Sequence, residues 1–265
     1  MNAESTIVCE GNVSYLRFGL LDNFPELVYG MFTRKGGKSG PPFDSLNVGE
    51  NVGDDAAIVA ENRRIVLSAM GGGHLVSLTQ VHGSKVVSVG RDDLPWGSAV
   101  EADALVTDIP GVILLIKVAD CQPVLIYDYK KRVVANVHSG WRGSVENILG
   151  DTLHVMTDDF GCDPATMVAA IGPSLGPCCA EFVDYKREIP EPLWMYKDDA
   201  HHFDFWRMSR DQLAQEGVPE EHIAVAGMCT RCRTDLFFSY RKEGTTGRLA
   251  CVIGLKDKTR TRRRG

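Results

Sequence analysis

The chain lacks three features that would each assign it to a particular class of protein. None of its apolar runs approaches the roughly 18 residues that a membrane-spanning helix needs. Its start, MNAESTIVCEGN, has an early acidic residue and no basic segment followed by an apolar core, so it does not resemble a secretory signal. An excess of positive charge is also absent. We therefore expect a cytoplasmic protein that does not contact a membrane.

The charge balance argues against nucleic acid as a partner. The formal net charge is −6, whereas nucleic-acid-binding domains carry a strongly basic surface. One basic segment, KDKTRTRRRG, ends the chain, and runs of this kind are usually solvated. We interpret residues 259–265 as a basic disordered tail.

The composition fits one folded domain. With 44% apolar and 24% charged residues, a chain of 265 residues can bury a sizeable core. No repeat, low-complexity segment or long linker rich in Gly, Ser and Pro divides it. Residues 1–258 are therefore predicted to form a single domain, whose assembly as a monomer or a homodimer stays open.

Two helices and one long loop are predicted from local patterns. Residues 33–55 are rich in Gly, Pro, Asn and Asp and predict an irregular loop, which at that length is usually functional or disordered. Residues 55–70 have apolar residues at helical spacing, with Asp54 or Asp55 as the N-cap. A second helix is predicted over residues 144–161.

Apolar runs of strand length fill much of the remaining chain. Residues 111–120 form a continuous run that is typical of a strand buried on both faces. Segments 121–128 and 132–138 are predicted to pair as an antiparallel hairpin. Further strands are predicted within 74–82, 85–90, 102–108, 167–172, 222–229 and 248–255. Together these segments predict an α+β fold with mixed β-sheet layers flanked by helices.

Eight cysteines without an export signal are expected to be reduced thiols. Cys229 and Cys232 form a C-x-x-C pair, but no second pair stands at zinc-ribbon spacing, which disfavours a structural zinc site. Cys178 and Cys179 are adjacent and would point in different directions in a regular element. Three others are interpreted as small apolar core residues: Cys9, Cys162 and Cys251.

Three potential metal ligands stand at or just beyond the ends of predicted strands: His82, Cys121 and His138. Strand ends let side chains from distant segments converge over a rigid scaffold. One cysteine and two histidines suffice for a tetrahedral zinc whose fourth position stays open. Spacing alone equally allows a buried thiol with two hydrogen-bonded histidines, or a Cys121 nucleophile activated by a histidine.

Three loops combine glycines with arginine, which suits an anionic small substrate. The segment VHSGWRG turns from a strand into a helix at Arg142, and TRKGGKSG contains Arg34. SYRKEGTTGR contains Arg241 and Arg248. Each loop taken alone is also explained as a turn with a surface arginine. The three together favour a phosphate-bearing or polyanionic small molecule.

Several motifs, in this order, closely resemble the laccase-domain family: TQVHG, ADALVTD followed by GVILLIKVADCQPVLIYD, VANVHSGWRGS, AAIGPSLGPCC and LFFSYRKEGTTGR. The resemblance extends from about Arg34 to Leu255. The family is also called multicopper polyphenol oxidase, and its members are regarded as purine nucleoside phosphorylases. It implies a single-domain mixed fold similar to a cysteine-hydrolase superfamily.

The resemblance also implies a cofactor, an activity and a set of site residues. It implies zinc, rather than copper, held by His82, Cys121 and His138. The implied reactions are phosphorolysis of adenosine, inosine and methylthioadenosine to the free base and the sugar 1-phosphate, and deamination of adenosine. Candidate substrate contacts are Arg34, Asn47, Gln80, Arg142 and Arg241. Asp120, Glu181 or Asp103 could supply the carboxylate that deamination needs.

Three other functions compete with this interpretation. Copper oxidation of polyphenols is disfavoured because a trinuclear copper cluster needs many histidines and the chain has seven, most of them scattered. A hydrolase or deamidase would use Cys121 as its nucleophile. A non-catalytic module would bind zinc or a nucleoside without turning it over.

Overall fold

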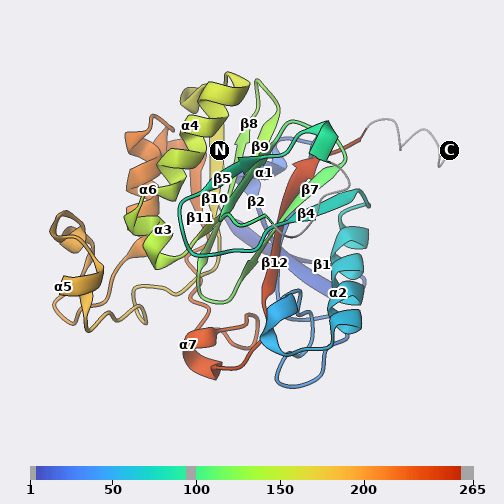
Figure 1. The fold of residues 1–265 in the computed structure, drawn as a ribbon, viewed down its shortest axis with the longest axis horizontal. Coiled ribbons are helices and arrows are strands. Elements are labelled where there is room, and N and C mark those ends of the chain that lie inside the picture. The colour runs from blue at the N-terminus through green and yellow to red at the C-terminus, as the bar shows by residue number, and fades with distance from the viewer. Residues whose placement is uncertain (1–3, 94–99, 258–265) are drawn as a thin grey trace.

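Two mixed six-stranded β-sheets pack face to face in the computed structural model, which describes residues 4–93 and 100–257 (Figure 1). The first sheet has the strand order β1-β2-β3-β12-β7-β4, with β1 Ser5–Glu10, β2 Val13–Phe18, β3 Leu27–Phe32, β12 Leu249–Leu255, β7 Val112–Val118 and β4 His74–Ser77. The second has the order β11-β10-β8-β9-β6-β5, with β11 Ile223–Val225, β10 Met167–Ile171, β8 Gln122–Asp128, β9 Val133–Ser139, β6 Ala104–Thr107 and β5 Val86–Ser88. The expected tail, 259–265, lies outside the described residues.

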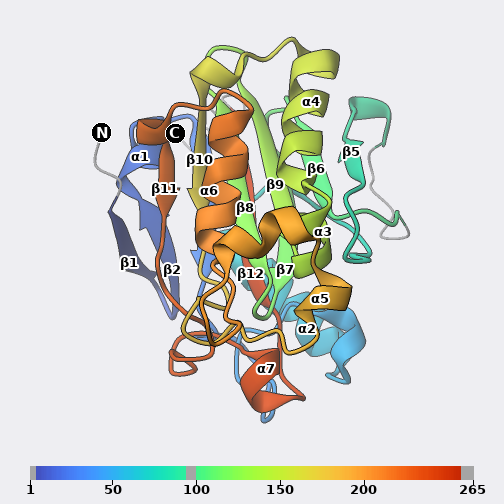
Figure 2. The ribbon, with the colours of Figure 1, turned by 90° about the vertical axis from the view of Figure 1, so that its left-hand side faces the viewer.

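The α-helices of the described residues are α1 Gly19–Asp22, α2 Ala56–Ala69, α3 Trp141–Val145, α4 Ile148–Phe160, α5 Tyr185–Glu188, α6 Phe205–Gln215 and α7 Tyr240–Glu243. Leu20 and Leu21 of α1 belong to the apolar cluster between the sheets, whereas the long helices form the outer layers. Short 3-10 turns lie at Glu50–Val52, Arg91–Asp93, Pro164–Thr166, Glu191–Tyr196 and Glu220–His222. Helices α4 and α6 run side by side over the outer face of the second sheet, and α2 covers the first sheet (Figures 1 and 2). The α+β class with mixed sheets flanked by helices is confirmed. No helix among the described residues is long and apolar enough to cross a bilayer.

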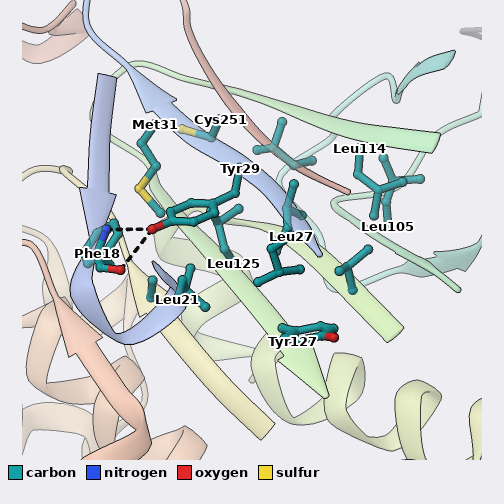
Figure 3. Packing of buried hydrophobic residues seen from close by; sticks show 14 of the residues in the cluster. Phe18, Leu21, Leu27, Tyr29, Met31, Leu105, Leu114, Leu125, Tyr127 and Cys251 are labelled. Carbon is teal, nitrogen blue, oxygen red and sulfur yellow. Dashed lines mark hydrogen bonds between the residues drawn. The ribbon is translucent and has the colours of Figure 1, made fainter. Parts of the chain in front are cut away.

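The largest apolar cluster lies between the two sheets (Figure 3). Leu114 comes from the first sheet, and Leu105 and Leu125 come from the second. The Tyr29 hydroxyl accepts a hydrogen bond from the Phe18 N–H at 3.0 Å, so this buried phenol is satisfied inside the core. Burial on both faces explains why the inner strands read as continuous apolar runs.

The hairpin predicted from 121–128 and 132–138 is confirmed as β8 and β9, and its register determines the geometry of the site. Gln122 pairs with Ser139 and Pro123 pairs with His138. Cys121 directly precedes β8, so this antiparallel register brings its thiol beside the end of β9.

A local signal fixes the start of the first long helix. The Asp55 carboxylate accepts hydrogen bonds from the Ala57 and Ile58 N–H groups, so Asp55 rather than Asp54 is the N-cap of α2. The loop before it is irregular apart from the 3-10 turn at Glu50–Val52, as predicted.

Two expectations are wrong. The single helix predicted over 144–161 is two helices, α3 and α4, because Asn147 between them adopts a left-handed φ of 62°. Cys9 is exposed rather than a core residue, because it lies on the edge strand β1. Cys162 and Cys251 are buried, as expected.

Candidate active site and metal centre

His82, Cys121 and His138 converge at the ends of strands that belong to both sheets. His82 lies in the loop that follows β4, Cys121 in the connection from β7 to β8, and His138 near the end of β9. One ligand atom from each lies within 4.8 Å of the other two. His138 is buried, Cys121 is half-buried and His82 is exposed, so the group has a fixed base and one side that is open to solvent.

The buried carboxylate of Asp103 orients both histidines. Its Oδ1 lies 2.7 Å from His138 Nδ1, which leaves Nε2 as the ring nitrogen available to a ligand. The same carboxylate accepts hydrogen bonds from the backbone N–H groups of His82 at 3.0 Å and Gly83 at 2.8 Å. Burial opposes ionisation, but the hydrogen bonds from His138 and Gly83 outweigh it and lower the pKa of Asp103 below its usual value.

The thiol and the buried imidazole favour each other's charged form. Burial alone would raise the pKa of Cys121, but the charge of His138 and hydrogen bonds from both imidazoles lower it to about 6. Burial alone would lower the pKa of His138, but the Cys121 charge and the Asp103 hydrogen bond raise it to about 9. Cys121 is therefore ready to act as a thiolate near neutral pH, either as a metal ligand or as a nucleophile.

Gly140 leaves room for this arrangement. A Cβ atom at this position would lie 3.1 Å from His82 Cδ2 and 3.5 Å from Cys121 Sγ. The backbone of Gly140 has an extended conformation with φ −71°, so the need for glycine here is steric rather than conformational. The strand therefore approaches the three ligand atoms closely because it carries no side chain at this turn.

The donor set fits zinc. Zinc binds imidazole nitrogen at about 2.0 Å and thiolate sulfur at about 2.3 Å, so small side-chain adjustments would close this group around one ion. A carboxylate bonded to the second nitrogen of a histidine, as Asp103 is to His138, is the usual support of such a ligand. Three protein ligands leave a fourth position for water or substrate.

A cavity of about 550 Å³ opens above these three residues. Charged side chains line it: Glu50, Asp120 and three cations that we call the cationic wall, Lys117, Arg241 and Arg248. Aromatic side chains, which we call the aromatic wall, line it as well: Trp141, Phe182, Phe205 and Tyr240. The two sets adjoin, because the Arg241 guanidinium lies 5.8 Å from the Phe182 ring centre. Apolar rings beside a few convergent polar groups are typical of a small-molecule site.

Of the three candidate carboxylates, Asp120 is the one that lines the cavity. It accepts hydrogen bonds from Thr230 Oγ1 and from the Arg241 N–H, both at 2.6 Å. Glu181 is exposed and contributes its backbone oxygen to Arg241 Nη1 at 3.1 Å. Asp103 lies beneath His138.

Two of the five candidate substrate contacts line the cavity, and the other three do not. Arg241 and Gln80 line the cavity. The side-chain amide of Gln80 is already engaged, because its Nε2 donates to the Lys117 carbonyl and its Oε1 accepts from the Lys117 N–H.

Asn47 is buried behind the wall, where its Oδ1 accepts from two backbone N–H groups. Arg34 lies in a second pocket, with Nη1 2.7 Å from Oε1 of Glu243. Arg142 does not line the cavity, but its guanidinium lies 4.6 Å from the ring centre of Trp141, which does.

Two cations of the cavity wall were not among the five candidate substrate contacts, although the loop that contains Arg248 was predicted to suit an anion. Arg248 follows the turn glycine of its loop, and Asn47 Oδ1 accepts from its backbone N–H at 2.8 Å. Lys117 donates from Nζ to the Leu78 carbonyl at 2.8 Å. Burial, reinforced by the charge of Arg63, lowers the pKa of Lys117 to about 8. The signal in the sequence was a single lysine inside the apolar run 111–120.

Several known proteins are similar to this chain in sequence and in fold. A family model described as multi-copper polyphenol oxidoreductase laccase matches residues 28–256. Purine nucleoside phosphorylase YlmD of Geobacillus stearothermophilus is 36% identical over 252 residues, which cover 88% of this chain and 92% of that protein. Purine nucleoside phosphorylase YfiH of Escherichia coli is 36% identical over 234 residues, covering 84% of this chain and 91% of that protein. The crystal structure of YlmD from G. stearothermophilus matches with a TM-score of 0.85 at 33% identity, covering 96% of this chain and 100% of the other. The chain therefore belongs to the laccase-domain family.

Proposed function

We propose that this protein is a zinc-dependent purine nucleoside phosphorylase that also deaminates adenosine. The observation that carries the proposal is the convergence of His82, Cys121 and His138 at the base of a cavity with both cationic and aromatic walls. The names of the similar proteins support the phosphorylase part of the proposal. The proposed substrates are adenosine, inosine and methylthioadenosine.

The metal would be held by His82, Cys121 and His138. When bound, zinc supplies a Lewis acid that polarises an oxygen at its open position. Copper suits this set less well as an oxidase centre, because a trinuclear cluster needs more histidines. Of the histidines in the described part of the chain, only His82 and His138 line the cavity.

The aromatic wall suits the purine base. Phe182 and Trp141 lie edge to face with their ring centres 6.0 Å apart, and Phe205 continues the same surface. A planar base can stack on such rings, while Asp120 offers a carboxylate to a ribose hydroxyl or an exocyclic amine. We assign base stacking to this wall and substrate orientation to Asp120.

The cationic wall suits phosphate. Phosphorolysis forms a bond between a phosphate oxygen and the sugar C1′ and breaks the bond from C1′ to the base, which leaves with a proton. Arg241, Arg248 and Lys117 would hold the phosphate and balance its charge. The Arg241 guanidinium is restrained by its hydrogen bond to the Glu181 carbonyl, which holds its charge beside the cavity that it lines.

Removal of the thiolate tests the proposal. Cys121→Ala should lose the zinc of this site and the phosphate-dependent release of hypoxanthine from inosine, because two histidines alone hold zinc weakly. Metal content and phosphorolysis are measured on the same preparation. Cys9→Ser, at an exposed position on the edge strand β1 and outside the cavity lining, is the control. Wild-type phosphorolysis by Cys121→Ala would refute the proposed mechanism.

A second candidate function rests on the contacts of Cys121. His138 pairs with both Cys121 and Asp103, which is the order of nucleophile, base and orienting acid in a cysteine hydrolase. Such an enzyme would be fully active without metal and would be inactivated by alkylation of Cys121. The phosphorylase requires metal, so activity before and after chelation separates the two functions.

A cytoplasmic location is part of the proposal. None of the eight cysteines forms a disulfide in the structure. Free thiols in such number persist in a reducing compartment.

A further inference from the structure

Four cysteines outside the cavity converge on one point. They are Cys178, Cys179, Cys229 and Cys232, and their sulfur atoms all lie within 4.8 Å of one another. Cys232 Sγ lies 3.7 Å from Cys178 Sγ and 3.6 Å from Cys179 Sγ. Both distances are longer than the bond of about 2.05 Å between the sulfur atoms of a disulfide, and all four cysteines are free thiols in the structure.

The parallel pairing of β10 and β11 creates this cluster. Because the two strands are parallel, they finish at the same end of the sheet. A β-bridge between Ser174 and Cys229 keeps the segments that follow them side by side. The first segment then turns at residues 177–179, where the Cys179 N–H donates to the Gly176 carbonyl at 2.9 Å. In a turn, unlike a strand, adjacent side chains can point to the same side, which corrects the expectation that these neighbouring cysteines diverge.

We propose that these four cysteines form a second metal site, a structural zinc held by four thiolates. A tetrahedral zinc with sulfur ligands at about 2.3 Å places the sulfur atoms about 3.8 Å apart, close to the two distances from Cys232. The Gly176 N–H donates to Cys229 Sγ at 3.3 Å, an interaction that stabilises a thiolate ligand. The sequence contains the C-x-x-C half of the site, and the fold supplies the other half from the adjacent cysteines.

This site would stabilise one wall of the cavity. Ser174 and Leu175 line the cavity and precede the first cysteine pair. The Leu175 N–H donates to the Asp120 carbonyl at 2.8 Å, and Thr230, between the second pair, donates to the Asp120 carboxylate at 2.6 Å. A zinc at the four cysteines would therefore hold both segments that position Asp120, without contacting the substrate.

The number of zinc ions per chain tests the proposal, independently of any activity. Protein purified under reducing conditions in the Cys121→Ala background should retain one zinc at about 2.3 Å from four sulfur atoms by X-ray absorption. Adding Cys178→Ser and Cys232→Ser should remove it. Both cysteines are exposed, so these changes leave the core intact. Adding Cys9→Ser, also exposed, should leave the zinc in place.

A ligand-preserving variant separates metal binding from simple structural damage. Cys232→His should keep zinc, with three sulfur atoms and one nitrogen around it, whereas Cys232→Ser should bind it at least tenfold more weakly. Retention of the full zinc content by Cys178→Ser/Cys232→Ser would overturn the proposal. So would stoichiometric iron in place of zinc, or a disulfide among these cysteines in the reduced, metal-supplied protein. The result does not depend on whether the protein is a phosphorylase.

Discussion

The buried Asp103 carboxylate supports two of the three proposed metal ligands. It bonds to the His138 ring and to the backbone of the loop that carries His82. An asparagine at this position has one acceptor oxygen and an amide that would face the same N–H donors. We predict that Asp103→Asn weakens zinc binding at this site about 10- to 100-fold. Competition with a chromophoric chelator measures the affinity.

The measurement is made in the Cys178→Ser/Cys232→Ser background, so that only one proposed site contributes. Asp92→Asn, which changes an exposed acid on a surface 3-10 turn, is the matched control and should bind zinc as the parent does. An affinity in Asp103→Asn equal to that of the control would show that the carboxylate does not support the ligands.

Lys117 links the proposed phosphate site to pH. Burial first, and the charge of Arg63 second, lower its pKa to about 8. The side chain is a cation below that pH and becomes neutral as the pH rises through it. We predict that the KM for phosphate increases between pH 7.5 and 9 with a midpoint near 8, because one cation of the cavity wall is lost.

Lys117→Met identifies the source of this increase. The variant should have a raised KM for phosphate already at pH 7.5 and no further increase with a midpoint near 8. The KM for inosine, measured in parallel, should change little in either protein. If the KM for phosphate of Lys117→Met still increases with a midpoint near pH 8, another group causes the increase.

At the scale of single elements, the break between α3 and α4 depends on Asn147. Its φ of 62° is left-handed, and its side chain accepts from the Gly150 N–H at 3.2 Å as the N-cap of α4. Alanine loses the cap, worth about 1 kcal/mol, and strains the backbone by about another 1 kcal/mol. Glycine loses only a few tenths of a kcal/mol as an N-cap. We predict that Asn147→Ala destabilises the protein by about 2 kcal/mol and Asn147→Gly by much less.

Urea unfolding followed by circular dichroism gives both free energies. Asn147→Asp keeps a capping oxygen and tolerates the left-handed conformation, so it should stay close to the wild type. Equal destabilisation by alanine and glycine would mean that backbone conformation does not contribute at this position.

Elements with continuous or periodic apolar residues could be predicted from the sequence, and others could not. The strands around residues 111–138 and the capped helix α2 have strong local signals. The break at Asn147 has none, because a residue in a left-handed conformation does not interrupt the apolar pattern around it. Strands β1 to β3 were not predicted, and β1 has an exposed edge without a regular apolar pattern.

At the scale of the whole molecule, the candidate site depends on contacts between segments far apart in the chain. The three proposed metal ligands were singled out at the ends of predicted strands, and the resemblance to the family then favoured the metal interpretation over its alternatives. The cations of the cavity wall were harder to find, since nothing local distinguishes Arg34, which pairs with Glu243, from Arg241, which lines the cavity. The four-cysteine cluster needed the parallel pairing of β10 and β11, which no local pattern reports.

The proposed metal centre also links the two sheets. His82 follows β4 of the first sheet, whereas His138 belongs to β9 of the second, and Cys121 lies in the connection between them. Unfolding separates these ligands, so zinc binds the folded state and stabilises it. With free zinc at about 100 times its Kd, the gain is about 2.7 kcal/mol, or roughly 5–10 °C in Tm. We predict this increase in the Cys178→Ser/Cys232→Ser protein, measured by thermal unfolding before and after chelation.

His82→Ala in the same background removes the one ligand that the first sheet contributes. His82 is exposed, but its φ of 61° is left-handed, so alanine should lower the metal-free stability by about 1 kcal/mol. Loss of the ligand should appear separately, as a smaller increase in Tm when zinc is added. Val81→Ala, a change at the exposed neighbouring residue, is the control and should retain the full increase in Tm with zinc. If zinc raises the Tm of His82→Ala as much as that of the parent, His82 is not a ligand. Zinc would then stabilise the protein through Cys121 and His138 alone, without joining the loop after β4 to the second sheet.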